Sequence, residues 1–233
     1  MSEQKKDHET VGHKKGNKSE ESLIPKHGGY RNLISFQVSQ LIYDVTVRFC
    51  DLYVDKFSRT KDQMVQAARS GVQNIAEGSK VSGTSKKMEM KLTNVARASL
   101  EELRLDYEDF LRQRGLPLLE AKDPVLMRFK ARKCRTLKDV QAWVKEERVI
   151  IKDKQRQART NTDIAHIKSS NVNECPCRSL SSACLAANGA LSLLNLASYL
   201  LGRQLAAQAE AFEKEGGFTE RIYQRRSQAR RKK

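Results

Sequence analysis

Hydrophobic residues recur at steps of three and four along most of this chain, the spacing that places them on one face of a helix. The pattern predicts four long helices, near residues 31–55, 61–78, 85–113 and 180–214. Short connections between successive helices favour antiparallel neighbours. The scarcity of proline and tryptophan, with abundant Leu, Ala, Lys, Glu and Gln, also favours helix over sheet. We therefore expect an all-α protein built on an antiparallel, up-down four-helix bundle.

The segment 64–80 is rich in small residues, which predicts a helix at the centre of that bundle. One stripe of this segment consists of Met64, Ala68, Gly71 and Ile75. Gly71 lowers helix propensity by about 1 kcal/mol relative to Ala, so we expect a closely packed neighbouring helix as compensation. Gly78 and Gly83 bracket the exit of the helix, where a C-cap and a turn are expected.

The first and third predicted helices each carry an apolar stripe. The stripe of the first is Ile34, Val38, Leu41, Val45, Phe49 and Leu52, and that of the third is Met88, Leu92, Val95, Ser99, Leu103 and Phe110. The third helix begins at Thr84 or Ser85 as N-cap, with bases in its first half and acids in its second. This order opposes the helix dipole. It indicates either a use for the basic end or a solvated face with ion pairs.

Residues 115–178 form an apparent insertion between the third and fourth helices. Asp123-Pro124 is a good N-cap and first-turn pair, and apolar residues after it suggest two amphipathic helices. The low apolar content of the N-terminal tail and the basic C-terminal tail predicts disorder for both. The expected divisions are a disordered tail at 1–29, bundle helices at 30–114, the insertion at 115–178, the fourth helix with a suffix at 179–220, and a basic tail at 221–233.

The segment 180–214 is the most strongly periodic part of the chain. Its seam is Cys184, Ala187, Leu191, Leu194, Ser198, Leu201 and Leu205. Residues 179–202 carry no charge and are long enough to span a membrane. Asn188, Asn195 and several serines favour a buried bundle helix instead, so we predict no membrane partner. Gly216-Gly217 is expected to end the helix.

The net charge of +16 and the pI of about 9.8 predict a polyanionic partner, with nucleic acid as the first candidate. The candidate phosphate-binding residues are Arg69, Lys80, Lys86, Lys87, Lys91 and Arg97 on the second and third helices, Arg128, Lys130, Arg132 and Lys133 in the insertion, and Arg225, Arg226, Arg230 and Arg231 in the C-terminal tail. No recognition-helix or RNA-binding aromatic motif is present. We therefore expect contacts to the backbone of RNA, or of RNA with DNA, rather than base readout.

No catalytic constellation, cofactor motif or metal site is predicted. Asp44, Asp51 and Asp55 make a polar stripe more simply than a nuclease site. Cys175-Pro176-Cys177, with Cys184 and His166, lacks the paired knuckles of zinc modules. Met1 to Glu21 holds no apolar signal core, and the five cysteines are read as reduced thiols. We expect a cytoplasmic, non-enzymatic protein.

The motif Asn74-Ile75-Ala76-Glu77-Gly78, after Gln63 and Ala67-Ala68, resembles the second helix of the bacterial four helix bundle protein family. Ser99-Leu100-Glu101-Glu102-Leu103 resembles the third helix of that family, and Phe218-Thr219-Glu220-Arg221 resembles a block of longer members with a C-terminal suffix. The family includes proteins encoded by intervening sequences in ribosomal RNA genes. It also includes the accessory variability determinant of diversity-generating retroelements.

This resemblance implies a homo-oligomer, a pentamer as in the retroelement members, which bind a reverse transcriptase and its RNA. Many members have two arginines just before the alanine pair, where this chain has Val65-Gln66, so phosphate contacts are expected elsewhere. The alternative function is a structural or regulatory protein-interaction bundle that binds no nucleic acid.

Overall fold

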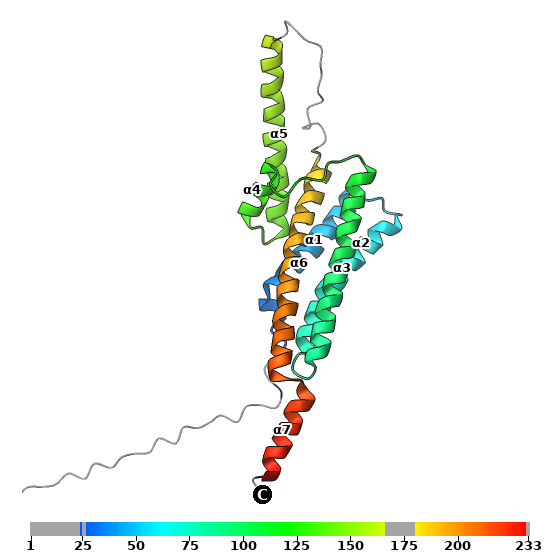
Figure 1. Ribbon diagram of the computed structural model, residues 1–233. Coiled ribbons are helices and arrows are strands. Elements are labelled where there is room, and N and C mark those ends of the chain that lie inside the picture. The colour runs from blue at the N-terminus through cyan, green and yellow to red at the C-terminus, as the bar shows by residue number, and fades with distance from the viewer. Residues whose placement is uncertain (1–23, 25–26, 166–179, 232–233) are drawn as a thin grey trace, which may run out of the picture.

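The computed structural model describes residue 24, residues 27–165 and residues 180–231, and every regular element in these ranges is a helix (Figure 1). The elements are a 3-10 turn η1 (Tyr30–Asn32) and the helices α1 (Ile34–Tyr53), α2 (Arg59–Val81), α3 (Lys86–Gln113), α4 (Pro124–Arg132), α5 (Leu137–Ala165), α6 (Ser182–Glu215) and α7 (Phe218–Arg231). The prediction of an all-α protein is therefore confirmed. The four long helices lie where their periodicity predicts them, with α1 and α2 differing by two or three residues at their ends.

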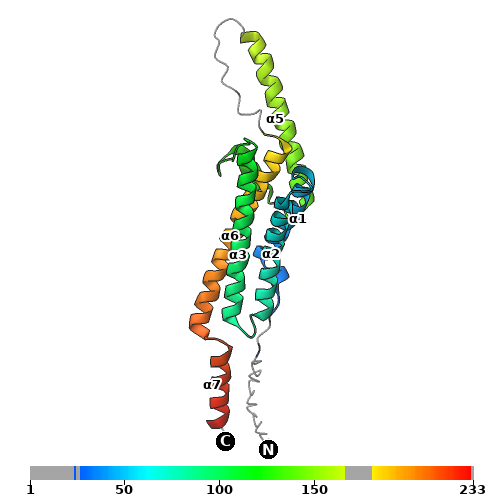
Figure 2. The same cartoon turned by 90° about the vertical axis from the view of Figure 1, so that its right-hand side faces the viewer.

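The helices pack in a bundle-like arrangement around one apolar core. α2 lies along α3, α3 lies along α6, and α1 contacts both α2 and α6 (Figures 1 and 2). The aromatic part of the core joins α1 to α3, because the Phe49 ring meets the edges of the Tyr107 and Phe110 rings at centroid distances of 4.9 and 4.7 Å. The Tyr107 hydroxyl donates to Thr46 Oγ1 at 3.1 Å, which satisfies a polar group inside this core.

Small residues allow α2 and α3 to approach closely, as predicted. A Cβ atom at Gly71 would lie 2.6 Å from Leu100 Cδ2, inside any allowed contact distance. Gly78 is not the C-cap, which corrects the prediction, because α2 continues to Val81 and Gly78 is buried against α3. The turn comes after Val81, whose carbonyl accepts the N–H groups of Thr84 and Ser85.

The apolar stripe predicted for α3 is wrong in its first half. Met88 and Val95 are 44% and 40% exposed, whereas the buried side of the helix consists of Thr93, Ala96, Leu100, Leu103, Tyr107, Phe110 and Leu111. The predicted and the observed residues both recur at helical spacing. Contact with α2 and α6 buries the observed set, whose first members are the smaller residues Thr93 and Ala96. The stripe predicted for α1 is likewise buried only in its middle, because Ile34 and Leu52 are exposed.

The insertion contains the two predicted helices. The Asp123 side chain accepts the N–H of Val125, and Pro124 occupies the first turn of α4. Trp143 of α5 is buried against Phe129 of α4, with ring centroids 4.6 Å apart. A Cβ at Gly189 of α6 would lie 3.0 Å from the Trp143 ring, so the insertion is seated on α6. The remainder of α5 extends beyond the bundle (Figure 1).

The prediction of a disordered C-terminal tail is wrong for the described residues, because 218–231 form helix α7. Gly216 ends α6 with a φ of 67°, and the Glu220 carboxylate accepts the N–H of Gly217 at 2.9 Å, which starts the next helix. Glu, Gln, Ala and Arg are good helix formers, so the sequence 218–231 does not oppose a helix despite its charge. The predicted N-terminal tail lies outside the described residues up to position 23.

Helix α6 is long and apolar enough to cross a membrane by length and composition. The core helix of a soluble protein passes the same test, and 61% of the most apolar stretch of α6 is buried inside the structure. Most of the predicted seam, Cys184, Ala187, Leu191, Leu194 and Leu201, is buried. The packing thus agrees with the expected bundle helix.

Candidate nucleic-acid interface

The turn between α2 and α3 gathers basic side chains at one end of the bundle. Ser85 caps α3 by accepting the N–H of Met88 at 3.2 Å, which places Lys86 and Lys87 in the first turn. Lys80 in the last turn of α2 is exposed, as are Lys87 and Lys91. None of these three exposed lysines forms an ion pair within the described residues. Their charges are therefore available to an external anion.

Lys86 differs from these three lysines because it has an acidic neighbour. Its Nζ lies 4.0 Å from Glu89 Oε2. Partial burial raises the pKa of Glu89. Two smaller effects act in the opposite direction: the positive charge of Lys86 and the hydrogen bond that Gln208 Nε2 donates at 3.1 Å. Gln208 thus joins α6 to the start of α3 through Glu89, and Lys86 is the lysine of this group that has an acidic partner.

Two further predicted cations lie away from this turn. Arg97 is exposed on α3, about 9 Å along the helix axis from Lys91 at 1.5 Å per residue. Arg69 is exposed on α2, about 16 Å along the axis from Lys80. We name Lys80, Lys87 and Lys91 the turn lysines, since all three are exposed and lie within about two helical turns of the α2–α3 connection.

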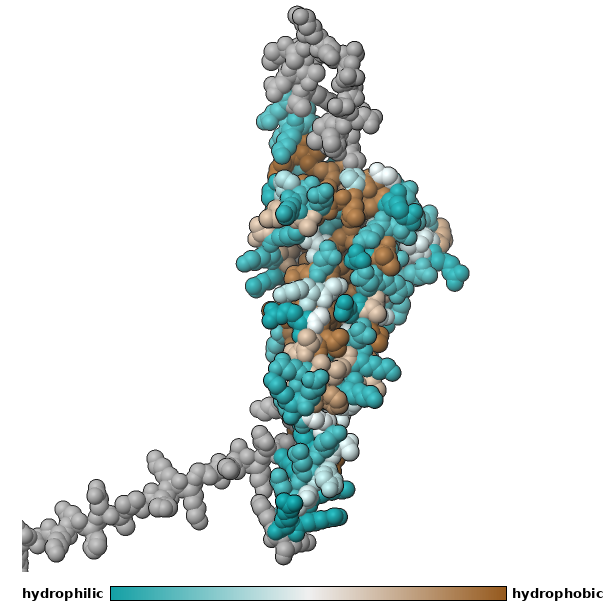
Figure 3. Space-filling view, viewed as in Figure 1, coloured by the Kyte–Doolittle hydropathy of each residue, from teal (hydrophilic) through white to brown (hydrophobic). Residues whose placement is uncertain are grey.

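Helix α7 lies at the same end of the molecule as the turn lysines (Figures 1 and 2). Its predicted arginines, Arg225, Arg226, Arg230 and Arg231, are exposed. Hydrophilic side chains cover α7, whereas hydrophobic patches reach the surface higher on the bundle (Figure 3). The fold thus brings two of the three predicted basic groups to one end, although about 140 residues separate them in the sequence.

One aromatic residue in this region was missed from the sequence. Tyr223 of α7 is 75% exposed, and the exposed Arg226 lies one helical turn after it. An exposed ring among cations can stack on an unpaired base while the arginines contact phosphates. The signal was available, because Arg225 and Arg226 follow Tyr223 closely in the printed sequence.

The insertion uses most of its predicted cations internally. Arg128 donates to both carboxylate oxygens of the buried Glu147, at 2.6 and 2.7 Å, and Arg132 pairs with Glu146. Lys130 donates to the carbonyl of Ala121. These contacts hold α4 to α5 and to the preceding loop. Among the four candidates of this group, Lys133 is exposed and forms no ion pair within the described residues.

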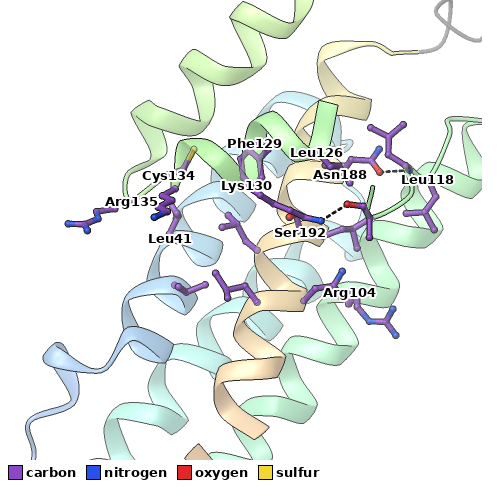
Figure 4. A pocket seen from close by; sticks show the side chains of 18 of the residues that line it. Leu41, Arg104, Leu118, Leu126, Phe129, Lys130, Cys134, Arg135, Asn188 and Ser192 are labelled. Carbon is purple, nitrogen blue, oxygen red and sulfur yellow. Dashed lines mark hydrogen bonds between the residues drawn. The ribbon is translucent and has the colours of Figure 1, made fainter. Parts of the chain in front are cut away.

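Beside the insertion lies an apolar groove of about 1070 Å³ that sequence reasoning did not predict (Figure 4). Its apolar lining is Ile34, Val38 and Leu41 of α1, Leu118 and Leu119 of the loop, Leu126 and Phe129 of α4, and Leu191, Leu193 and Leu196 of α6. Asn188 fixes the loop, because its Nδ2 donates to Pro117 O at 3.0 Å and its Oδ1 accepts from Leu119 N at 2.8 Å. The charged residues that line it are Lys130, Lys133 and Arg135, which we name the rim, and the ion pair of Arg104 with Glu108 at 2.7 Å.

The three aspartates considered as a nuclease set have separate partners. Asp51 pairs with Lys61 at 2.9 Å, Asp55 accepts the N–H of Phe57 at 2.7 Å, and Asp44 accepts weakly from Gln40 at 3.4 Å. Within the described ranges, no three His, Cys, Asp or Glu side chains gather as metal ligands would.

The cysteine and histidine candidates give no reactive site in the described part of the chain. Burial raises the pKa of both Cys50 and Cys184 to about 11, which disfavours a reactive thiolate. His166, Cys175 and Cys177 lie outside the described residues.

Comparison with protein-family models, with curated proteins and with solved structures finds no match. The resemblance to the four helix bundle protein family stays a prediction.

Proposed function

We propose that this chain is a non-enzymatic nucleic-acid-binding scaffold that contacts RNA, or RNA with DNA, through its basic end. The observation that carries the proposal is the set of three turn lysines, which are exposed and form no ion pair within the described residues, at the end where α7 presents its arginines. Each cation that neutralises a phosphate releases counterions, so the free energy comes mainly from the backbone and depends on salt. Tyr223 adds a stacking surface.

We infer that the scaffold is an antiparallel, up-down four-helix bundle of α1, α2, α3 and α6. The contacts support this inference, because α1–α2, α2–α3, α3–α6 and α6–α1 close a cycle of neighbours. In such a bundle the α2–α3 turn and the C-terminal end of α6 lie at the same end. This topology explains why the turn lysines and α7 lie at the same end of the molecule.

The family resemblance extends the proposal to partners. It favours a cytoplasmic homo-oligomer, a pentamer, that binds a reverse transcriptase and its RNA as the accessory factor of a diversity-generating retroelement. Exposed apolar side chains on the bundle, among them Ile34 and Leu105, are consistent with self-association. The alternative, a protein-interaction bundle without nucleic-acid binding, is favoured by one observation, the apolar groove.

Charge reversal at the two ends of the molecule tests the proposal. The first variant replaces the turn lysines Lys80, Lys87 and Lys91 with Glu, and the matched control replaces the exposed Lys138, Lys145 and Lys152 of α5 with Glu. Both variants lower the net charge by the same amount, so general attraction to a polyanion changes equally. Fluorescence anisotropy with a structured RNA should show a larger loss of affinity for the first variant, with a shallower dependence on salt.

Two outcomes would contradict the proposal. Equal losses for the two variants would mean that net charge, and not the basic end, determines binding. Negligible affinity of the wild-type protein for RNA and DNA at low salt would leave the protein-interaction alternative.

A further inference from the structure

Two surfaces of this chain are unpartnered and carry opposite charge. The first, which we name the acidic patch, consists of Glu102, Leu105, Asp106 and Asp109 on α3. The second is the apolar groove between α1, α4 and α6 with its basic rim of Lys130, Lys133 and Arg135.

The acidic patch lies on the outward face of α3. Glu102, Leu105 and Asp109 recur at steps of three and four, while the buried face is formed by Leu100, Leu103 and other residues about half a turn away. Leu105 is 53% exposed and lies one helical turn from both Glu102 and Asp109. The patch therefore offers one apolar side chain with acids one turn before it and one turn after it.

The negative charge of the patch is poorly compensated inside the protomer. Asp109 pairs with the exposed Arg112 at 2.7 Å, and Glu102 and Asp106 form no ion pair within the described residues. Partial burial raises the pKa of Asp106, and the neighbouring charges of Glu102 and Asp109 raise it further. A cation from outside the protomer would relieve this repulsion.

The groove has the complementary character. Its floor is apolar, and Ile34 and Leu196 at its edges are 63% and 44% exposed. Lys133 and Arg135 form no ion pair among the described residues, and Lys130 is bound only to the Ala121 carbonyl. Figure 4 shows Lys130 reaching over the groove and Arg135 pointing outward from its rim. An occupant with an apolar centre and acidic flanks would match this surface.

We propose that the groove of one copy receives the acidic patch of α3 from a second copy. The inference rests on the self-association named under the proposed function and adds the two surfaces that make the contact. Such a contact is heterologous, because each copy uses its groove toward one neighbour and its patch toward the other. Repetition of a heterologous contact closes into a ring when the rotation allows, which is the assembly a cyclic pentamer needs.

Charge reversal and its compensation test this assignment. One full-length variant carries Glu102→Lys and Asp109→Lys in the patch, and another carries Lys133→Glu and Arg135→Glu at the rim. Each variant should dissociate toward the 26.5 kDa monomer, with a dissociation constant raised about tenfold or more, because like charges then face each other. The variant with all four substitutions restores opposite charges in every contact, and it should assemble again. Sedimentation velocity over a concentration series measures the assembly.

A control variant carries Glu213→Lys and Glu215→Lys, two exposed acids near the end of α6, and should assemble like the wild type. Circular dichroism checks that each variant is folded. Unchanged assembly of either two-substitution variant, or no recovery in the four-substitution variant, would overturn the assignment.

Two results separate this inference from the wider proposal. A monomeric wild-type protein at tens of micromolar would refute both self-association and this inference. It would not bear on RNA binding, which the anisotropy measurement tests separately. Rim substitutions that weaken RNA binding while assembly is unchanged would assign the rim cations to nucleic acid and overturn only the inference.

Discussion

Replacing Gly71 with alanine tests the close packing of α2 on α3. The new Cβ would lie 2.6 Å from Cδ2 and 2.8 Å from Cγ of Leu100, which is fully buried. Cγ is not the flexible end of the side chain, so the helices or the Leu100 rotamer must shift. Overpacking of this kind costs about 1–3 kcal/mol, and the better helix propensity of alanine returns about 1 kcal/mol. We expect a net loss of about 1 kcal/mol in the free energy of unfolding.

Gly202 of α6 provides the matched control. A Cβ at this position meets nothing within 4 Å, so Gly202→Ala should stabilise the protein by up to about 1 kcal/mol through helix propensity alone. The two substitutions are chemically identical and should have opposite signs. Urea unfolding followed by circular dichroism measures the free energy of unfolding of both variants. The protein concentration is kept fixed, because self-association contributes to stability.

A double substitution isolates the contact with Leu100. In a Leu100→Ala background the obstructing side chain is gone, and Gly71→Ala should then stabilise the protein. Equal effects of Gly71→Ala in the two backgrounds, or stabilisation in the wild-type background, would refute the packing argument.

Three further predictions concern charge and recognition. Arg128→Met should lower the free energy of unfolding by about 3 kcal/mol, because it leaves the buried Glu147 carboxylate without its partner. This value is the lower end of the range for a broken buried pair, since Arg128 itself is partly exposed. Denaturant unfolding measures the change, and a loss under about 0.5 kcal/mol would contradict the prediction. Hydrogen bonds from the backbone N–H groups of Arg135 and Thr136 lower the pKa of Asp139 in the folded protein. The ionised Asp139 therefore stabilises the fold above its unfolded pKa of about 3.9, and this stabilisation is lost as pH falls through the lower pKa of the folded state. Asp139→Asn should flatten the stability profile in this acid range, and an unchanged slope would argue against it. Tyr223→Ala should weaken RNA binding by about 1–3 kcal/mol without changing the dependence of affinity on salt. The control Tyr199→Ala on α6 should leave RNA affinity unchanged. Equal losses of affinity for the two variants would exclude specific stacking on Tyr223.

Helix positions were predictable because periodicity and capping act over a few residues. Asp123-Pro124 and Gly216 were recognised as start and stop signals, and the structure places helix ends at both. The inner face of α3 was not predictable in the same way. Met88 and Val95 are larger and more apolar than Thr93 and Ala96, so they were read as core. The packing of α3 against α2 and α6 nevertheless buries Thr93 and Ala96, and no local pattern encodes that choice of face.

The candidate site was predictable as a set of charges but not as an arrangement. Counting bases in the insertion ignored Glu146 and Glu147, whose pairing with Arg132 and Arg128 depends on how α4 folds back on α5. The C-terminal tail was read as disordered from its charge, although it contains no residue that opposes a helix between 218 and 231. Its position at the same end as the turn lysines follows from the packing of α6, which no local pattern encodes.

Photo-cross-linking gives the most direct test of where nucleic acid binds. A structured RNA carrying 4-thiouridine is irradiated with the full-length protein, and mass spectrometry then identifies the cross-linked peptides. We expect cross-links in residues 80–97 and in α7, with Tyr223 among the modified positions. Cross-links confined to α5, or spread in proportion to the lysines and arginines along the chain, would contradict a basic end that binds RNA.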